Sequence, residues 1–206
     1  MMSPKSKKQA TNIQRIIHRP GEGHTVDITI SAGDGNENIG HMDLGNLPVP
    51  DRRFACDAVG IKVLTSEVQL FFAQSKPIGD GLLSLLVLNM AFEAVGQFLH
   101  SAPLEFAEQF HKAFPGHPKV TTTDFQHPAD QTVVLAAGIV LAGYTGTNGC
   151  MDFYYASPFS QQQIATMRRL SVESVVRVNL AAPLMFAIIK ALRDAETRFP
   201  NLKVGE

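Results

Sequence analysis

The residues most able to perform chemistry in this chain are two cysteines and seven histidines, and their spacing fits no metal site or catalytic motif. Cys56 and Cys150 are too far apart in the sequence for a CxxC or zinc-binding pattern. The densest group of histidines, with an acidic neighbour, comprises His100, His111, His117, Asp124 and His127. Because it contains no HExxH or HxH motif and no nearby cysteine pair, no metal site is predicted.

Cys150 is the candidate nucleophile, and it would need a base such as His127 or His24 to approach it in space. A small hydrolase or transferase with a loop-borne Cys/His site is therefore the alternative interpretation of this chain. No GxSxG elbow is present. The turns Gly33-Asp34-Gly35 and Gly79-Asp80-Gly81 lack the GKS/T and GxGxxG patterns that bind phosphate. No catalytic residue and no cofactor are predicted.

Charge is distributed unevenly along the 206 residues, although the formal net charge is only −1. Five of the 18 basic residues precede the first acidic residue, Glu22, which leaves 13 basic against 19 acidic residues, a net −6, in the remainder. A basic terminus attracts phosphate groups, but terminal segments are commonly disordered and solubilising. We therefore expect a basic disordered tail at residues 1–22 and do not expect nucleic acid as a partner.

The most apolar stretch, Leu82–Leu99, is long enough to span a bilayer but contains Asn89, Glu93 and Gln97. Placing a carboxylate in lipid costs about 2 kcal/mol or more, so this stretch is expected in a protein core. The basic start is followed by mostly polar residues 9–14 rather than by the apolar region of a signal peptide. We expect no membrane span and a cytoplasmic location.

Alternating apolar residues predict strands in the first half of the chain. Thr25–Ile30 alternates with a period of two, and Ile39–Leu44 is expected to form a short edge strand. Val59–Phe72 alternates on both sides of a polar break, which is typical of a hairpin. Leu82–Leu99 is interpreted as a strand followed by a helix, and one long helix is the alternative. Pro103–Phe114 is expected to be helical.

The second half of the chain repeats this order. Val133–Ala142 and Met151–Tyr155 are expected to be strands, with the strongest hairpin signal of the chain, Asn148-Gly149, between them. A further apolar run then passes through Asn179, the expected N-cap, into an amphipathic helix. Pro183 is early enough to be tolerated in the first turn.

Two pairs of segments carry a family resemblance: Val68–Ala73 with Val87–Leu99, and Met151–Ala156 with Val176–Leu192. Together they resemble tandem copies of the SecB-like fold, which the protein-export chaperones share with a family of short bacterial proteins. The resemblance implies an α+β fold of antiparallel β-sheets backed by helices, in two hairpin-strand-helix units. We place the first unit, with its helical extension, at residues 23–120 and the second at residues 121–206.

Five aromatic residues are the candidate binding residues. The two-residue period places Phe71 and Tyr154 on the sheet faces opposite their core neighbours, where an apolar side chain usually marks an interface. Phe106, Phe110 and Phe114 form a stripe at four-residue spacing. We therefore expect a non-enzymatic, homo-oligomeric binding protein, a SecB-like chaperone or adaptor that presents an apolar sheet face to a protein or peptide client.

Overall fold

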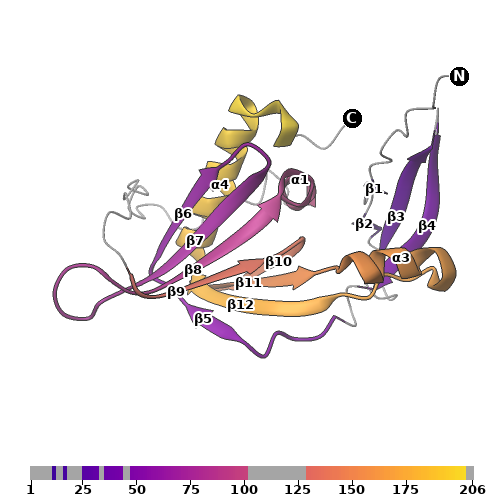
Figure 1. The fold of residues 1–206 in the computed structure, drawn as a ribbon. Coiled ribbons are helices and arrows are strands. Elements are labelled where there is room, and N and C mark those ends of the chain that lie inside the picture. The colour runs from indigo at the N-terminus through magenta and orange to yellow at the C-terminus, as the bar shows by residue number, and fades with distance from the viewer. Residues whose placement is uncertain are drawn as a thin grey trace, which may run out of the picture. The chain divides into compact units, whose positions relative to one another are not determined.

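The computed structural model shows an α+β fold with mixed and antiparallel sheets and a small number of helices (Figure 1). It divides into two compact units, Met1–Leu47 with Ala156–Val172, and Pro48–Tyr155 with Glu173–Glu206. The residues that the structure describes are 11–12, 16–17, 25–32, 35–43, 47–101 and 129–202.

The first compact unit contains a small sheet centred on β3 (Thr25–Ala32). β4 (Gly35–Asp43) pairs antiparallel with β3, and so do the short strands β1 (Thr11–Asn12) and β2 (Ile16–Ile17). The strands expected at Thr25–Ile30 and Ile39–Leu44 are therefore confirmed, within a longer hairpin. β1 and β2 fall within residues 1–22, where a disordered tail is expected, and their β-branched residues have ladder partners on β3.

Helix α3 (Pro158–Met167) also belongs to this unit and was not predicted. Its start carries a recognisable signal, since the Ser157 hydroxyl accepts a hydrogen bond from the Ser160 amide at 3.1 Å and Pro158 occupies the first turn. Its apolar residues form no continuous stripe: Ile164 is buried, whereas Phe159 and Met167 are exposed. The periodicity that indicates an amphipathic helix is absent.

The second compact unit contains two four-stranded sheets. In the first, β6 (Ala58–Val63), β7 (Glu67–Ser75) and β8 (Leu82–Ala91) form an antiparallel meander. β9 (Ala129–Ala136) adds to β8 in parallel and forms the edge. Helix α1 (Phe92–Ser101) follows β8 directly, so the strand-then-helix interpretation is confirmed and the single long helix is wrong.

In the second sheet, β10 (Ile139–Thr145), β11 (Asn148–Tyr155) and β12 (Glu173–Ala181) are antiparallel, and β5 (Arg53–Ala55) pairs in parallel with β12. The β10–β11 turn is a tight one, and Gly146, with φ of 58°, supplies its left-handed residue.

The turn does not fall at Asn148-Gly149, which starts β11. The expected strand Val133–Ala142 is likewise two strands in different sheets. The chain crosses between them at Ala137, whose N–H donates to the Asn89 carbonyl, and at Gly138, whose N–H donates to the Tyr154 carbonyl. A continuous apolar run contains no alternation that would mark such a crossing.

The second long helix, α4 (Ala182–Arg198), is followed by the short 3-10 turn η2 (Pro200–Leu202). Asn179 is not its N-cap, because that residue still belongs to β12, and Ala181 occupies the cap position without a side-chain hydrogen bond. Pro183 lies in the first turn as predicted.

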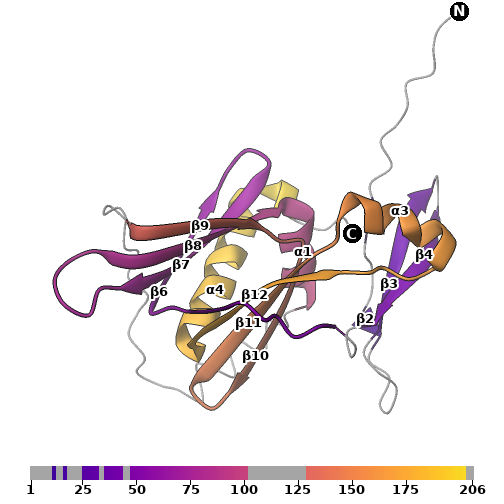
Figure 2. The same ribbon diagram turned by 60° about the horizontal axis from the view of Figure 1, so that its bottom comes forward.

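One hydrophobic core joins both sheets and both helices of this unit (Figure 2). The rings of Phe72 on β7 and Phe153 on β11 meet edge to face, with centroids 5.7 Å apart. Helix α1 contacts β8 and β10, and α4 contacts β6 and β11, so each helix touches both sheets. The largest fully buried side chains are Phe72, Phe153, Leu70, Leu86, Leu88, Met90, Leu99, Met151, Met185, Ile188 and Leu192.

None of the helices within the described residues is long and apolar enough to cross a membrane.

Candidate functional site

Phe71 lies on the outer face of the β6–β9 sheet, as the two-residue period predicts. Its Cα partners are Gly60 on β6 and Val87 on β8, and Val87 is in turn paired with Val134 on β9. Paired residues point to the same face of a sheet. An uncharged row therefore crosses all four strands, with Phe71 half-buried, Val87 buried and Val134 58% exposed at the edge.

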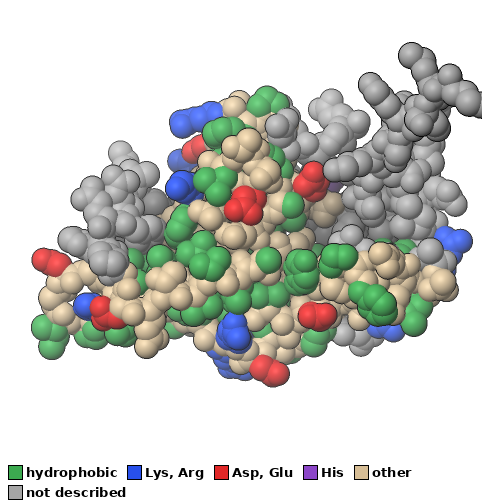
Figure 3. Space-filling view, in the orientation of Figure 1, with side chains coloured by type: hydrophobic (Ala, Val, Ile, Leu, Met, Phe, Trp, Pro, Cys, Tyr) green, Lys and Arg blue, Asp and Glu red, His purple; other side chains and the backbone are tan. Residues whose placement is uncertain are grey.

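Large apolar side chains are exposed along β8, β9 and the β7–β8 loop. We call this group the edge patch; it consists of Ile78, Leu83, Val133 and Val134, with exposed fractions of 90%, 39%, 44% and 58%. Figure 3 shows hydrophobic side chains in a band along the sheets, between the charged groups. Val134 shares the outer face with Val87, whereas Val133 pairs with Leu86 and points to the opposite face, so the edge patch exposes apolar side chains from both faces of the sheet. Several exposed apolar side chains along one edge mark a binding surface more often than single exposed residues do.

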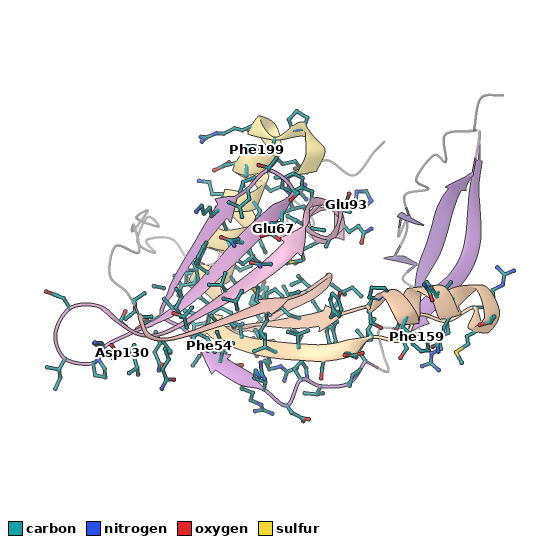
Figure 4. The ribbon with its side chains drawn as sticks, in the orientation of Figure 1. Phe54, Glu67, Glu93, Asp130, Phe159 and Phe199 are labelled. Atoms are coloured by element: carbon teal, nitrogen blue, oxygen red, sulfur yellow. The ribbon has the colours of Figure 1, made fainter. Side chains whose placement is uncertain are left out.

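An ion pair holds the loop that carries Ile78 against the edge strand. The Lys76 ammonium on this β7–β8 connection lies 2.8 Å from a carboxylate oxygen of Asp130 on β9. Asp130 is labelled in Figure 4, beside that loop. The pair is partly exposed, so its contribution to stability is small.

The edge patch was missed at the level of sequence. Val133 and Val134 belong to an apolar run that reads as a buried strand, because nothing local shows that β9 is an edge. Ile78 carried the one available signal, since an isolated large apolar residue between Pro77 and Gly79 stands in a turn rather than in a strand.

Tyr154 does not lie on an open surface. Its side chain is on the outer face of β11 but is only 2% exposed, so the expected exposure of Tyr154 is not found, and its role as a binding residue stays a prediction. It lies beside an ion pair in which the Arg177 guanidinium donates to both carboxylate oxygens of Asp152, at 2.6 Å each. The fork geometry satisfies a carboxylate that is almost fully buried.

The electrostatics of this cluster follow from burial and from the ion pair. Burial raises the pKa of Tyr154, Asp152 raises it further, and Arg177 opposes both. The hydrogen bond to Asp152 raises the pKa of Arg177, so the guanidinium stays charged at every accessible pH. The Asp152–Arg177 pair is therefore an internally neutralised structural group.

The two cysteines are both free and partly buried. Burial, with a smaller contribution from Asp57, raises the pKa of Cys56 to about 12, so its thiol stays protonated and is a poor nucleophile at neutral pH. Cys150 lies on β11, and its Cα partners are Gly143 and Asn179. The bases considered for it, His127 and His24, lie outside the described residues.

Within the described part of the chain, no group of histidine, cysteine or acidic side chains is arranged to hold a metal ion. His100 is exposed at the end of α1, and the other members of its sequence cluster lie outside the described residues. The remaining predicted binding residues, Phe106, Phe110 and Phe114, also lie outside them.

Comparison of the chain with protein-family models, with curated proteins and with solved structures found no match.

Asp152→Asn is expected to destabilise the protein by about 1–3 kcal/mol, because it leaves the partly buried Arg177 without its counter-charge and removes one acceptor. Glu173→Gln, an exposed acidic residue on the neighbouring strand, is the matched control and should change stability by less than about 0.5 kcal/mol. Urea unfolding followed by circular dichroism measures both variants. Equal effects of the two substitutions would show that the ion pair does not stabilise the fold.

Proposed function

We propose that this protein is a non-enzymatic protein- or peptide-binding protein, a SecB-like chaperone or adaptor, and that its client contacts the edge patch. The observation that carries the proposal is the exposure of four large apolar side chains around the β8–β9 edge and the β7–β8 loop. Phe71 extends the same uncharged surface across the outer face of the sheet.

The energetics favour an apolar client at this place. Complete burial of a Val, Leu or Ile side chain yields about 1.5–3 kcal/mol relative to exposure in water. Ile78 and Val134 still expose more than half of their surface, so a client that covers them gains most of this energy. The Lys76–Asp130 pair bounds the patch on one side and already neutralises its own charges, which leaves the patch suited to uncharged segments.

The test measures light scattering from an unfolded model protein diluted out of denaturant. The intact chain should slow aggregation at molar excess, and the double variant Ile78→Ser/Leu83→Ser should lose most of that protection, because it removes apolar area from the patch. The matched control is Phe159→Ser/Met167→Ser, which removes exposed apolar side chains from the other compact unit and should retain protection. Equal protection by both double variants, or none by the intact chain, would contradict the proposal.

We also propose that the two sheets are tandem copies of one module, β6–β7–β8–α1 and β10–β11–β12–α4, that exchange a strand. The support is a matching pair of hydrogen bonds: the Ala137 N–H donates to the Asn89 carbonyl, and the Cys56 N–H donates to the Asn179 carbonyl, both at 3.0 Å. Ala137 directly follows β9, which precedes the second module but pairs in parallel with β8 of the first. Cys56 directly follows β5, which precedes the first module but pairs in parallel with β12 of the second.

Matching these asparagines also aligns the hairpins. The next residue after each donor also bonds to a hairpin strand: the Asp57 N–H donates to the Ala73 carbonyl on β7, and the Gly138 N–H donates to the Tyr154 carbonyl on β11. In this alignment Phe71 corresponds to Asp152. The comparison of the sequence segments had matched Phe71 with Tyr154, two residues further along β11. Equivalent outer-face positions hold an apolar row in one module and the Asp152–Arg177 ion pair in the other.

Proline substitutions test the equivalence of the two exchanged strands. Ala137→Pro and Cys56→Pro each remove the N–H that bonds to an asparagine carbonyl, and both should lower the free energy of unfolding by a similar amount, about 1–3 kcal/mol beyond their controls. The controls are Ala136→Pro and Ala55→Pro, whose N–H groups point away from the paired strand. A large loss in only one of the two test variants would contradict the tandem arrangement.

The alternative function, a hydrolase or transferase that uses Cys150, stays a prediction from the sequence alone. The bases that it would need, His127 or His24, lie outside the described residues. Turnover in a broad substrate screen that disappears in Cys150→Ser would favour it over the binding function.

A further inference from the structure

Strand β9 is the most accessible edge of the two sheets in the larger compact unit. The sheets end at β6 and β9, and at β10 and β5. Helix α4 packs against β6 and α1 packs against β10, while β5 has only three residues. β9 has eight residues, and five consecutive ones, Asp130–Val134, are exposed.

The register of β9 shows which of its backbone groups are directed outward. The Ala137 N–H donates to Asn89 on β8, and successive residues of a strand direct their N–H and C=O groups to opposite sides. Val133 and Leu135 therefore bond toward β8. Thr132 and Val134 direct their N–H and C=O groups to the outer edge, where no described strand pairs with them.

This edge lacks the features that keep natural sheet edges from pairing with other chains. Gln131–Ala136 contains no charged residue and no proline, and the β8–β9 ladder shows no bulge. Long edge strands of this kind pair with another strand unless a charge, a proline or a bulge prevents it. Asp130 is the one charged residue of β9, and Lys76 of the same chain already neutralises it.

We propose that β9 is a homodimer interface, in which two copies of this chain pair their β9 strands antiparallel about a two-fold axis at Val133. When two copies of one strand pair antiparallel about a two-fold axis, the numbers of opposite residues always add to the same sum. The hydrogen-bonded pairs are those whose backbone N–H and C=O groups are directed to the outer edge. With Val133 opposite itself, Thr132 bonds to Val134 of the second copy, and Asp130 lies opposite Ala136. No like charges are opposed in this register, and β-branched residues fill its centre.

The dimer would join two four-stranded sheets into one eight-stranded sheet and bring the two edge patches together. The Val134 side chain stays on the outer face, beside the Thr132 side chain of the second copy. The uncharged row that starts at Phe71 then continues into the next chain. A second copy fits this edge without the help of a client, although the interface shares Val133 and Val134 with the edge patch.

Sedimentation equilibrium of the full chain tests the interface. We expect a concentration-dependent dimer. Val134→Pro should shift the dissociation constant upward by at least about tenfold, because proline removes an outward N–H and no bond to β8. Val134→Thr, which retains the N–H and the branched shape, should remain a dimer. A monomeric intact chain at all concentrations, or an unchanged dimer in a folded Val134→Pro, would overturn the proposal.

If circular dichroism shows that Val134→Pro does not fold, Val134→Lys serves instead, since a lysine on an edge strand opposes pairing without altering the backbone. The register has its own test in a Cys56→Ser/Cys150→Ser background. Val133→Cys should form a disulfide-linked dimer under mild oxidation, because non-hydrogen-bonded cross-strand pairs bring the two side chains close together. Ile78→Cys, more exposed but away from the axis, should crosslink much less.

The outcomes separate this inference from client binding. A monomer that still slows client aggregation refutes the β9 interface and leaves the binding function standing. A dimer that gives no protection supports the interface and refutes the binding function. Equal crosslinking of Val133→Cys and Ile78→Cys would contradict the two-fold register.

Discussion

The larger compact unit depends on the parallel pairing that completes each of its sheets. A three-stranded meander leaves the backbone groups of its last strand unpaired, and unpaired backbone groups are costly wherever water is excluded. β9 supplies the missing partner to β8, and β5 supplies it to β12, from positions far away in the sequence. Because each added strand is followed directly by a strand of the other sheet, the two sheets are tied together by backbone hydrogen bonds as well as by the shared core.

The side chains of the outer faces show how one backbone arrangement accepts opposite chemistries. The positions next to the centre of one sheet carry Phe71 and Val87, and those of the other carry Asp152 and Arg177. Both arrangements avoid burying an unpaired polar group. Apolar side chains have no polar group to pair, and the buried Asp152 carboxylate has a bidentate partner in Arg177. Tyr154, beside this ion pair, is covered as well.

Much of the secondary structure could be predicted because it follows from local residue patterns. Alternation identified the β6–β7 hairpin, and the parallel with the β-branched run Val175–Leu180 identified β8 followed by α1. Helix α3 was not predicted because its apolar residues form no stripe. The β10–β11 turn was expected two residues too late, because Asn148-Gly149 is the stronger turn signal in the sequence, whereas Gly146 adopts the left-handed conformation in the structure. The candidate site was predicted only at Phe71, the one described aromatic residue that is on the expected face and still partly exposed.

In the larger unit, the sequence by itself determined the strands β6 to β8 with α1, strand β11, the apolar run that leads into α4, and the apolar faces of β7 and β11, since these properties depend on residues a few positions apart. Only the tertiary structure decided that the run from Val133 to Ala142 divides between two sheets, that Val133 and Val134 lie at an exposed edge, and that Tyr154 is covered. Strand partners are chosen by hydrogen bonds between residues distant in sequence, and exposure depends on what lies across a strand. Neither quantity leaves a periodic signal in the chain, so both had to be read from the fold.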